Sequence, residues 1–447
     1  MPPVRSRFSS ERGAILIQVA VCLLVLLAFS AFVVDYGVMW ASRGQAQTAA
    51  DAGALAGAIS LAYETEGNTA AQQANARAKA RATAQQNFVW GEAPDVQPGD
   101  VTFPPCPPGA PGPPDTCIRV DAHRNQTRGN PLSMFFGNLV GVGSQGVRAT
   151  ATAQVTAADT SECLRPWAVI DRWNEFHTDQ PEPDAPDNDF DWNSTYDKYS
   201  DGKGSSPPQE NDLYVPPSAA GPGTGFRIPD DAGKRFVVKT DTNTNSTVSP
   251  GWFRAIRIPR LDGQNGGAVY RDNISRCGGL PTSYWTPGND PCPANISNDD
   301  MAYWATQGCY ATEPGNMVGP TGQGVDDILA TDPSAVWVEG ATPAEGYVEN
   351  SIHGEDWLKS KRIVPVGVID IDWFLSQDPS GANGVLRLVN IFGFFIEGMG
   401  DVDAATGAIT LSPSGKAVVG RVLTIPATGI GRLHTNATFL RTIILVR

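Results

Sequence analysis

The chain has 447 residues and a formal net charge of −14 at pH 7. Its acidic balance, with no basic cluster beyond the first dozen residues, gives no footprint for a nucleic acid, so we expect no nucleic-acid partner. Its length allows two or three domains besides a short anchor.

The first element is an unbroken apolar run at residues 14–34. As a helix it would cover about 31 Å, close to the thickness of the hydrocarbon core of a bilayer. Arginines precede the run and Asp35 follows it, so the positive-inside rule places residues 1–13 in the cytoplasm and the bulk of the chain outside. We therefore predict a retained single-pass transmembrane helix, and a signal peptide cleaved near Ser30 is the alternative.

The sequence from Tyr36 to about Tyr63 contains no proline and continues the helix. Small residues recur there every four positions and fall on one face. Glycine costs about 0.5 to 1 kcal/mol relative to alanine inside a helix, so its presence favours close packing over helix propensity alone. The face would contact a partner or the chain's own domain, and it consists of Ala46, Ala50, Gly53, Ala54, Gly57 and Ala58.

The stretch from Arg12 to Ala58 resembles the N-terminal segment of the TadG-like proteins of the Tad/Flp (tight adherence) pilus-assembly system. The resemblance lies in the order Arg-Gly, apolar span, Val-Asp and a helix with Gln-x-x-Ala-Asp-Ala-x-Ala-Leu-Ala-Gly-Ala at 47–58. It continues more loosely to about Ala157. The resemblance implies a protein of the bacterial cell membrane that assists or joins a pilus. Its partners would be the inner membrane and other pilus-assembly or pilin proteins, and an enzyme is not implied.

Two residues bear on processing of the N-terminus. Type IV prepilins and pseudopilins are cut after a glycine and carry a glutamate at the fifth mature position. Here Gly13 is followed at that position by Gln18, which cannot neutralise the amine of a neighbouring subunit. We therefore favour an unprocessed anchor over a processed pilin-like subunit.

Six cysteines lie outside the span, and disulfides are the default expectation for them in an oxidising compartment. Cys106 with Cys117 is the most natural local bridge, because it would close a proline-rich loop that cannot hold a sheet or helix. No pair has the C-x₂₋₄-C spacing of a structural zinc site. The disulfide candidates are Cys106, Cys117, Cys163, Cys277, Cys292 and Cys309, whereas Cys22 lies in the span.

Beyond the span, residues 35–157 are predicted to form a small α+β module with a second helix from Thr69 to about Phe88. Residues 158–222 form an acidic, proline- and serine-rich region that we interpret as a surface excursion. Residues 223–447 are predicted to be a mainly β extracytoplasmic domain with few helices. Its expected strands are 235–239, 251–258, 363–371, 385–396, 417–425 and 438–446. The fold class is therefore α+β, with one transmembrane helix continuing into an Ala-rich exported helix.

No pattern predicts catalysis or a required cofactor. The histidines stand alone, and neither G-x-S-x-G nor H-E-x-x-H occurs. Asp370 and Asp372 would share one face of a strand, which more often marks a structural acidic pair than an acid–base pair. Calcium is a minor alternative, because an acidic segment without the glycine and glutamate of an EF-hand contains Asp187, Asp189, Asp191 and Asn193.

Three functions remain open. The favoured one is a membrane-anchored extracytoplasmic protein that assists assembly or anchoring of a Tad/Flp-type pilus through protein–protein contacts. The second is a processed pilin-like subunit. The third is a surface adhesin or carbohydrate-binding module on a membrane anchor, which aromatic residues of the β-rich domain would allow: Trp252, Tyr284, Trp285, Tyr303 and Trp304.

Overall fold

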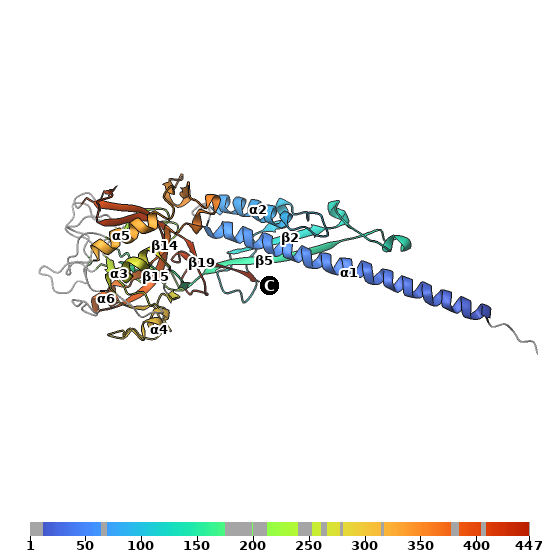
Figure 1. The fold of residues 1–447 in the computed structure, drawn as a ribbon, viewed down its shortest axis with the longest axis horizontal. Helices are drawn as coiled ribbons and strands as arrows, with labels where there is room; N and C mark the ends of the chain where they lie inside the picture. Colours follow the sequence, from blue (N-terminus) through green and yellow to red (C-terminus); the bar gives the residue numbers. More distant parts are fainter. Residues whose placement is uncertain are drawn as a thin grey trace, which may run out of the picture.

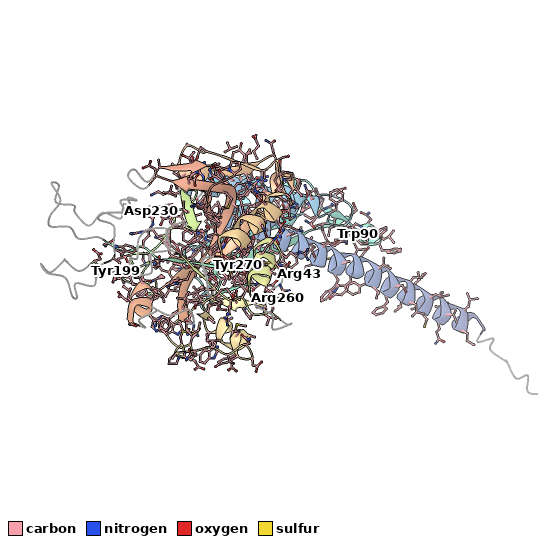
Figure 2. All side chains as sticks on the ribbon, turned by 60° about the vertical axis from the view of Figure 1, so that its left-hand side comes forward. Arg43, Trp90, Tyr199, Asp230, Arg260 and Tyr270 are labelled. Atoms are coloured by element: carbon pink, nitrogen blue, oxygen red, sulfur yellow. A yellow bond between two sulfur atoms is a disulfide. The ribbon has the colours of Figure 1, made fainter. Side chains whose placement is uncertain are left out.

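The computed structural model describes residues 12–63, 69–174, 199, 212–239, 253–260, 266–277, 280–313, 317–376, 384–403 and 408–446. It contains a long N-terminal helix, a module around the second half of that helix, and a larger β-rich body (Figure 1). The predicted α+β class, with a β-rich C-terminal region, is confirmed. Figure 2 shows Arg43 and Trp90 on the part of the body from which the long helix projects, and Tyr199 towards the opposite end.

Helix α1 (Arg12–Tyr63) runs without a break from the apolar run through the small-residue stretch, because neither part contains a proline. Its N-terminal half projects from the rest of the molecule (Figure 1), and the large apolar side chains between Ile15 and Val34 are exposed. In the described part of the chain, α1 is the one helix that is long and apolar enough to cross a membrane.

The second half of α1 and helix α2 (Thr69–Gln86) pack on a five-stranded sheet with the order β1-β2-β5-β19-β18. Its strands are β1 (Val101–Thr102), β2 (Cys117–Arg124), β5 (Val147–Ala157), β18 (Ile425–Pro426) and β19 (Leu440–Val446). The alternation in β5 turns small residues, Ala149, Ala151 and Ala153, into the core. These alanines leave room for α1 to approach the sheet.

Strand β19 belongs to this first sheet although it ends the C-terminal body. It pairs antiparallel with β5, from Arg441 opposite Ala157 to Val446 opposite Thr152. Two hydrogen bonds tie it to the end of α1: the Tyr63 hydroxyl donates to the Arg441 carbonyl at 3.0 Å, and Arg441 Nη1 donates to the Ala62 carbonyl at 3.0 Å. The first module is therefore completed by the last strand.

The C-terminal body is built on an eight-stranded sheet with the central order β8-β17-β15-β14-β7-β9, in which β11 and β16 also pair with β15. All neighbours are antiparallel except β14 and β7. Both faces of β15 are buried in apolar clusters, as expected for a nearly continuous apolar strand. The strands are β7 (Trp167–Ile170), β8 (Arg235–Lys239), β9 (Phe253–Ala255), β11 (Cys309–Ala311), β14 (Ile363–Ile369), β15 (Val385–Val402), β16 (Ile409–Leu411) and β17 (Ala417–Leu423).

The body contains more helix than the sequence predicts. Helices α3 (Gly267–Ser275) and α5 (Val318–Leu329) pack on each other and bury Tyr270, Ile274 and Val325 against the sheet. The body also contains two short helices, α4 (Met301–Thr306) and α6 (Ile371–Ser376). α4 and α6 have six residues each, too few turns to show a clear period of 3.6 residues. α5 contains glycines and a proline near its start, which are typical of turns.

Short paired strands complete the structure. They are β3 (Leu132–Ser133) with β4 (Ser144–Gln145), β6 (Thr160–Ser161) with β10 (Thr282–Ser283), and β12 (Val336–Val338) with β13 (Tyr347–Glu349). The first pair forms a hairpin whose tip carries the 3₁₀ helix η3 (Gly137–Val140). This hairpin reaches along α1 towards its N-terminus further than the rest of the body (Figure 1).

Candidate functional site

The small-residue face of α1 is used inside the chain's own domain. Ala46, Ala50, Ala54 and Ala58 are fully buried. A Cβ atom on Gly53 would lie 2.9 Å from the Ala80 carbonyl oxygen and 2.9 Å from the Ala84 Cβ, and one on Gly57 would overlap the Ile118 side chain. The glycines therefore let the backbones of α1 and α2 approach each other beside β2.

We expect Gly53→Leu to lower the free energy of unfolding by about 1 to 3 kcal/mol, because a leucine overpacks the contact with α2. Gly44→Leu in the same helix is the matched control, since a Cβ at Gly44 meets no atom within 4 Å. That change should be neutral or slightly stabilising, because glycine is the poorer helix former. Urea unfolding of the full chain in detergent measures both variants, and equal losses would contradict close packing at Gly53.

Asp35, the first residue after the apolar run, binds the tip of the β3–β4 hairpin. Its carboxylate accepts three backbone N–H groups in succession: Phe135 at 2.8 Å, Phe136 at 3.0 Å and Gly137 at 2.6 Å. This arrangement fixes the tip to α1 at the end of the predicted span. The sequence alone does not predict this role of Asp35, and its one signal is the Val-Asp step after the span.

A buried arginine holds the base of the same hairpin. Arg124, at the end of β2, donates through Nε to the Asn130 carbonyl at 3.1 Å and through Nη1 to the Val89 carbonyl at 2.9 Å. Its Nη2 lies 2.9 Å from the Glu92 carboxylate. The hairpin is therefore attached to the module at its base and to α1 at its tip.

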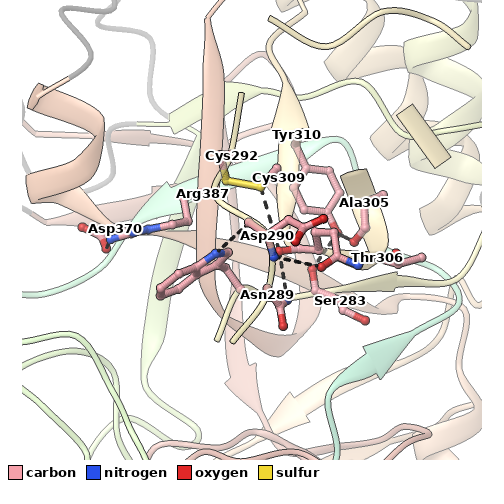
Figure 3. Close-up of a disulfide and its surroundings, with 12 residues drawn as sticks. Ser283, Asn289, Asp290, Cys292, Ala305, Thr306, Cys309, Tyr310, Asp370 and Arg387 are labelled. Carbon is pink, nitrogen blue, oxygen red and sulfur yellow. Dashed lines mark hydrogen bonds and ion pairs between the residues drawn. A yellow bond between two sulfur atoms is a disulfide. The ribbon is translucent and has the colours of Figure 1, made fainter. Parts of the chain in front are cut away.

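The structure pairs the six cysteines outside the span as Cys106–Cys117, Cys163–Cys277 and Cys292–Cys309. The first pair closes the proline-rich loop before β2. The second joins the start of the C-terminal body to the end of α3, and the third leads into β11 (Figure 3). Cys22 is free and exposed on α1.

The placement of Asp370 and Asp372 on one strand face is wrong. Strand β14 ends at Ile369, and the chain then turns into α6. Asp370 is buried, pairs with Arg387 (Figure 3) and accepts the Trp373 N–H at 2.9 Å. Asp372, on α6, accepts a hydrogen bond from the Tyr199 hydroxyl. Asp370 thus stabilises the start of a helix and an ion pair.

The aromatic residues proposed for an adhesin do not form one exposed platform. Tyr284 is buried and donates its hydroxyl to the Ala158 carbonyl at 3.1 Å. The Arg387 guanidinium lies 4.4 Å from the centre of the Trp285 ring. Tyr303 is exposed and contacts Trp304 edge-on. The fifth residue, Trp252, lies outside the described residues.

The described residues contain no group of three or more His, Cys, Asp or Glu side chains arranged to hold a metal ion. The calcium candidates at 187–193 lie outside the described residues. A cavity of about 360 Å³ lies between the first module and the C-terminal body, with a mixed polar and apolar lining that includes Gln72, Phe103, Thr156, Ile228 and Asn436.

Comparison with protein families matches two models to the N-terminal third of the chain. The Tad model, Flp pilus-assembly TadE/G-like, covers residues 13–60, and the Tad_C model, Tad-like Flp pilus-assembly, covers residues 56–153. No curated protein and no solved structure matches the chain. The matched residues contain α1, α2 and the hairpin that Asp35 binds. Residues 13–153 thus carry the TadE/G-like and Tad-like domains of the Flp pilus-assembly families.

Proposed function

We propose that this protein is anchored in the cell membrane by α1 and assists assembly or anchoring of a Tad/Flp-type pilus through protein–protein contacts. The observation that carries the proposal is the continuity of α1, which joins an exposed apolar half to a half packed inside the module that the family models match. A single stiff helix would hold the β-rich body at a fixed distance from the bilayer. Pilin or other pilus-assembly proteins would then bind the body.

The orientation belongs to the same proposal. The arginines before the span favour a cytoplasmic N-terminus. All three disulfides lie in the part of the chain that follows the span. Disulfides persist in oxidising compartments, which supports an extracytoplasmic body.

A cell-based experiment tests the proposal. Deleting the gene should abolish sheared surface pili, and the wild-type chain should restore them while remaining in the membrane fraction. The intact mass of that chain, extracted without reductant, should correspond to the full 47.4 kDa less the hydrogens lost in three disulfides. Pili at normal levels in the deletion strain would contradict an assembly role.

The intact mass also distinguishes the pilin-like alternative from a retained anchor. A chain that lacks residues 1–13 and is recovered with the sheared filaments would make this protein a subunit that leaves the bilayer. Gly13→Leu should block such processing, whereas Gly37→Leu, at a helical glycine with no atom within 4 Å of its Cβ position, is the control. A full-length wild-type mass, with both variants heavier by only the same added leucine side chain, supports the static anchor.

A further inference from the structure

We propose that the tip of the β3–β4 hairpin, residues 135–142, inserts into the membrane surface beside α1 and forms a second contact with the lipid. The inference rests on the proposed membrane span of α1. It assigns a lipid-binding role to a loop of the folded module.

The tip of the hairpin lies beside the end of the predicted span. The Asp35 carboxylate binds the tip, and Asp35 directly follows the apolar run. The tip is thereby held beside the end of the predicted span, and it is the part of the body that reaches furthest along α1 (Figure 1). If α1 crosses a bilayer with residues 14–34 in the hydrocarbon, the tip lies at the membrane–water boundary.

The sequence of the hairpin is uncharged and its tip is apolar. The segment from Pro131 to Val147 contains no charged residue. Its tip exposes large apolar side chains: Phe135 is 61%, Phe136 42%, Leu139 83% and Val142 41% exposed. Surface residues of this kind grouped on one loop mark an interaction site rather than ordinary scattered exposure.

The neighbouring surface of α1 also fits a bilayer boundary. Tyr36 and Trp40, which follow Asp35 on the helix, are 54% and 71% exposed. Tyrosine and tryptophan are enriched where a protein meets the headgroup layer, because their rings combine an apolar body with a polar group. The apolar tip thus lies at about the same level along α1 as these two aromatic residues.

Most backbone N–H groups of the tip are hydrogen-bonded within the protein, at residues 135–137, 139, 141 and 142, which favours contact with lipid. An unpaired N–H costs several kcal/mol in the hydrocarbon region. Asp35 accepts the N–H groups of residues 135–137, and carbonyls within the tip accept those of Leu139 at 2.9 Å, Gly141 at 3.3 Å and Val142 at 2.8 Å. At the base of the tip, the Met134 N–H donates to the Gly143 carbonyl at 3.1 Å.

The test places a single fluorescent probe on the full chain in lipid vesicles. Cys22→Ser removes the free thiol, and the other cysteines are joined in disulfides, so an introduced cysteine is the one that reacts. A polarity-sensitive label is attached at Leu139→Cys, at Leu24→Cys in the span, or at Ile352→Cys in the body. All three side chains are aliphatic and well exposed, at 83%, 67% and 66%. Lipids with a nitroxide on the acyl chain then quench labels that contact the bilayer.

We expect the label at position 139 to emit at shorter wavelength and to be quenched by the lipids, as at position 24, while position 352 shows neither effect. Asp35→Ala should reduce the quenching at position 139 without changing it at position 24, because the freed N–H groups of the tip turn to water.

The other outcomes contradict the inference in distinguishable ways. If the label at position 24 is quenched but the label at position 139 behaves like the one at position 352, α1 still spans the bilayer and the tip lies in water. A shift to shorter wavelength at 139 without quenching would assign the tip to a protein contact, such as a second copy of the chain. An unquenched label at 24 would overturn the proposed span itself, and the second contact with it.

Discussion

Arg362→Met is expected to lower the free energy of unfolding by about 3 to 5 kcal/mol. Arg362 lies just before β14 and is 4% exposed. Its guanidinium donates to the Ile396 carbonyl at 2.8 and 3.0 Å, to the Asp332 carbonyl at 3.0 Å and to the Ala335 carbonyl at 2.6 Å. Methionine retains much of the volume but donates no hydrogen bond, so these carbonyls would lose the hydrogen bonds from the guanidinium, although the Asp332 carbonyl still accepts the Ala335 N–H at 3.3 Å.

The arginine is effective here because its planar fork reaches two elements at once. Through Ile396 it holds the long central strand β15, and through Asp332 and Ala335 it holds the segment before β12. The guanidinium also lies 4.7 Å from the centre of the Phe395 ring. A lysine has no such fork, so Arg362→Lys should restore only part of the lost stability.

Arg271→Met is the matched control. Arg271, on α3, is much more exposed than Arg362, with 43% of its side chain accessible, and it forms two hydrogen bonds with Asp327, at 2.8 and 3.0 Å. Ion pairs at the surface contribute little, so we expect a much smaller loss than from Arg362→Met. Chemical denaturation of the full chain in detergent compares the two variants, and a similar loss from both would show that the buried carbonyls find other donors.

Strands with a strong apolar pattern could be predicted from the sequence, whereas their partners could not. β8 occupies the predicted residues, and β14 and β17 start where predicted. The predicted strand 385–396 ends where Glu397 interrupts the apolar run. β15 in fact continues six residues further, because Arg235 and Arg421 bind the Glu397 carboxylate within the sheet. The pairing of β19 with β5 joins residues far apart in sequence, and alternation along one strand carries no information about its neighbour.

The polar contacts of the candidate site show the same limit. Asp35 stands next to the span in the sequence, but its three N–H partners lie about 100 residues further on. Asp370 was expected on a strand face, because the apolar pattern did not show where β14 ends and α6 begins. Such contacts depend on tertiary placement, which a single sequence with no periodic signal does not specify.

Asp171→Asn is expected to make the protein more stable at neutral and alkaline pH and to leave it little changed below about pH 4. Asp171 follows β7, is fully buried, and its carboxylate accepts the Phe226 N–H at 2.9 Å, the Arg172 N–H at 3.0 Å and the Tyr214 hydroxyl at 3.3 Å. Burial raises the pKa of Asp171 to about 7, and the nearby Asp370 carboxylate acts in the same direction.

The direction of the change in stability with pH follows from proton linkage. A folded-state pKa near 7 against an unfolded value of about 3.9 means that the native state binds more protons between these values, so stability falls as pH rises from about 4 to about 7. The wild-type chain would lose on the order of 3 to 4 kcal/mol over this window from this group. Asparagine keeps an oxygen for the two N–H groups and can donate to Tyr214, but it has no proton to lose in this range.

Thermal unfolding of both proteins between about pH 4 and about pH 8 measures the difference. Asp356→Asn is the control, because Asp356 is exposed and its hydrogen bond from Lys359 lowers its pKa. The stabilisation by that carboxylate is fully present above its unfolded pKa and is lost only in acid. Its removal should therefore cause a small loss that stays constant across the neutral-to-alkaline range, with no rise or fall with pH there. If Asp171→Asn instead destabilises the protein most at the alkaline end, the buried carboxylate is ionised in the native state and its three donors outweigh the burial.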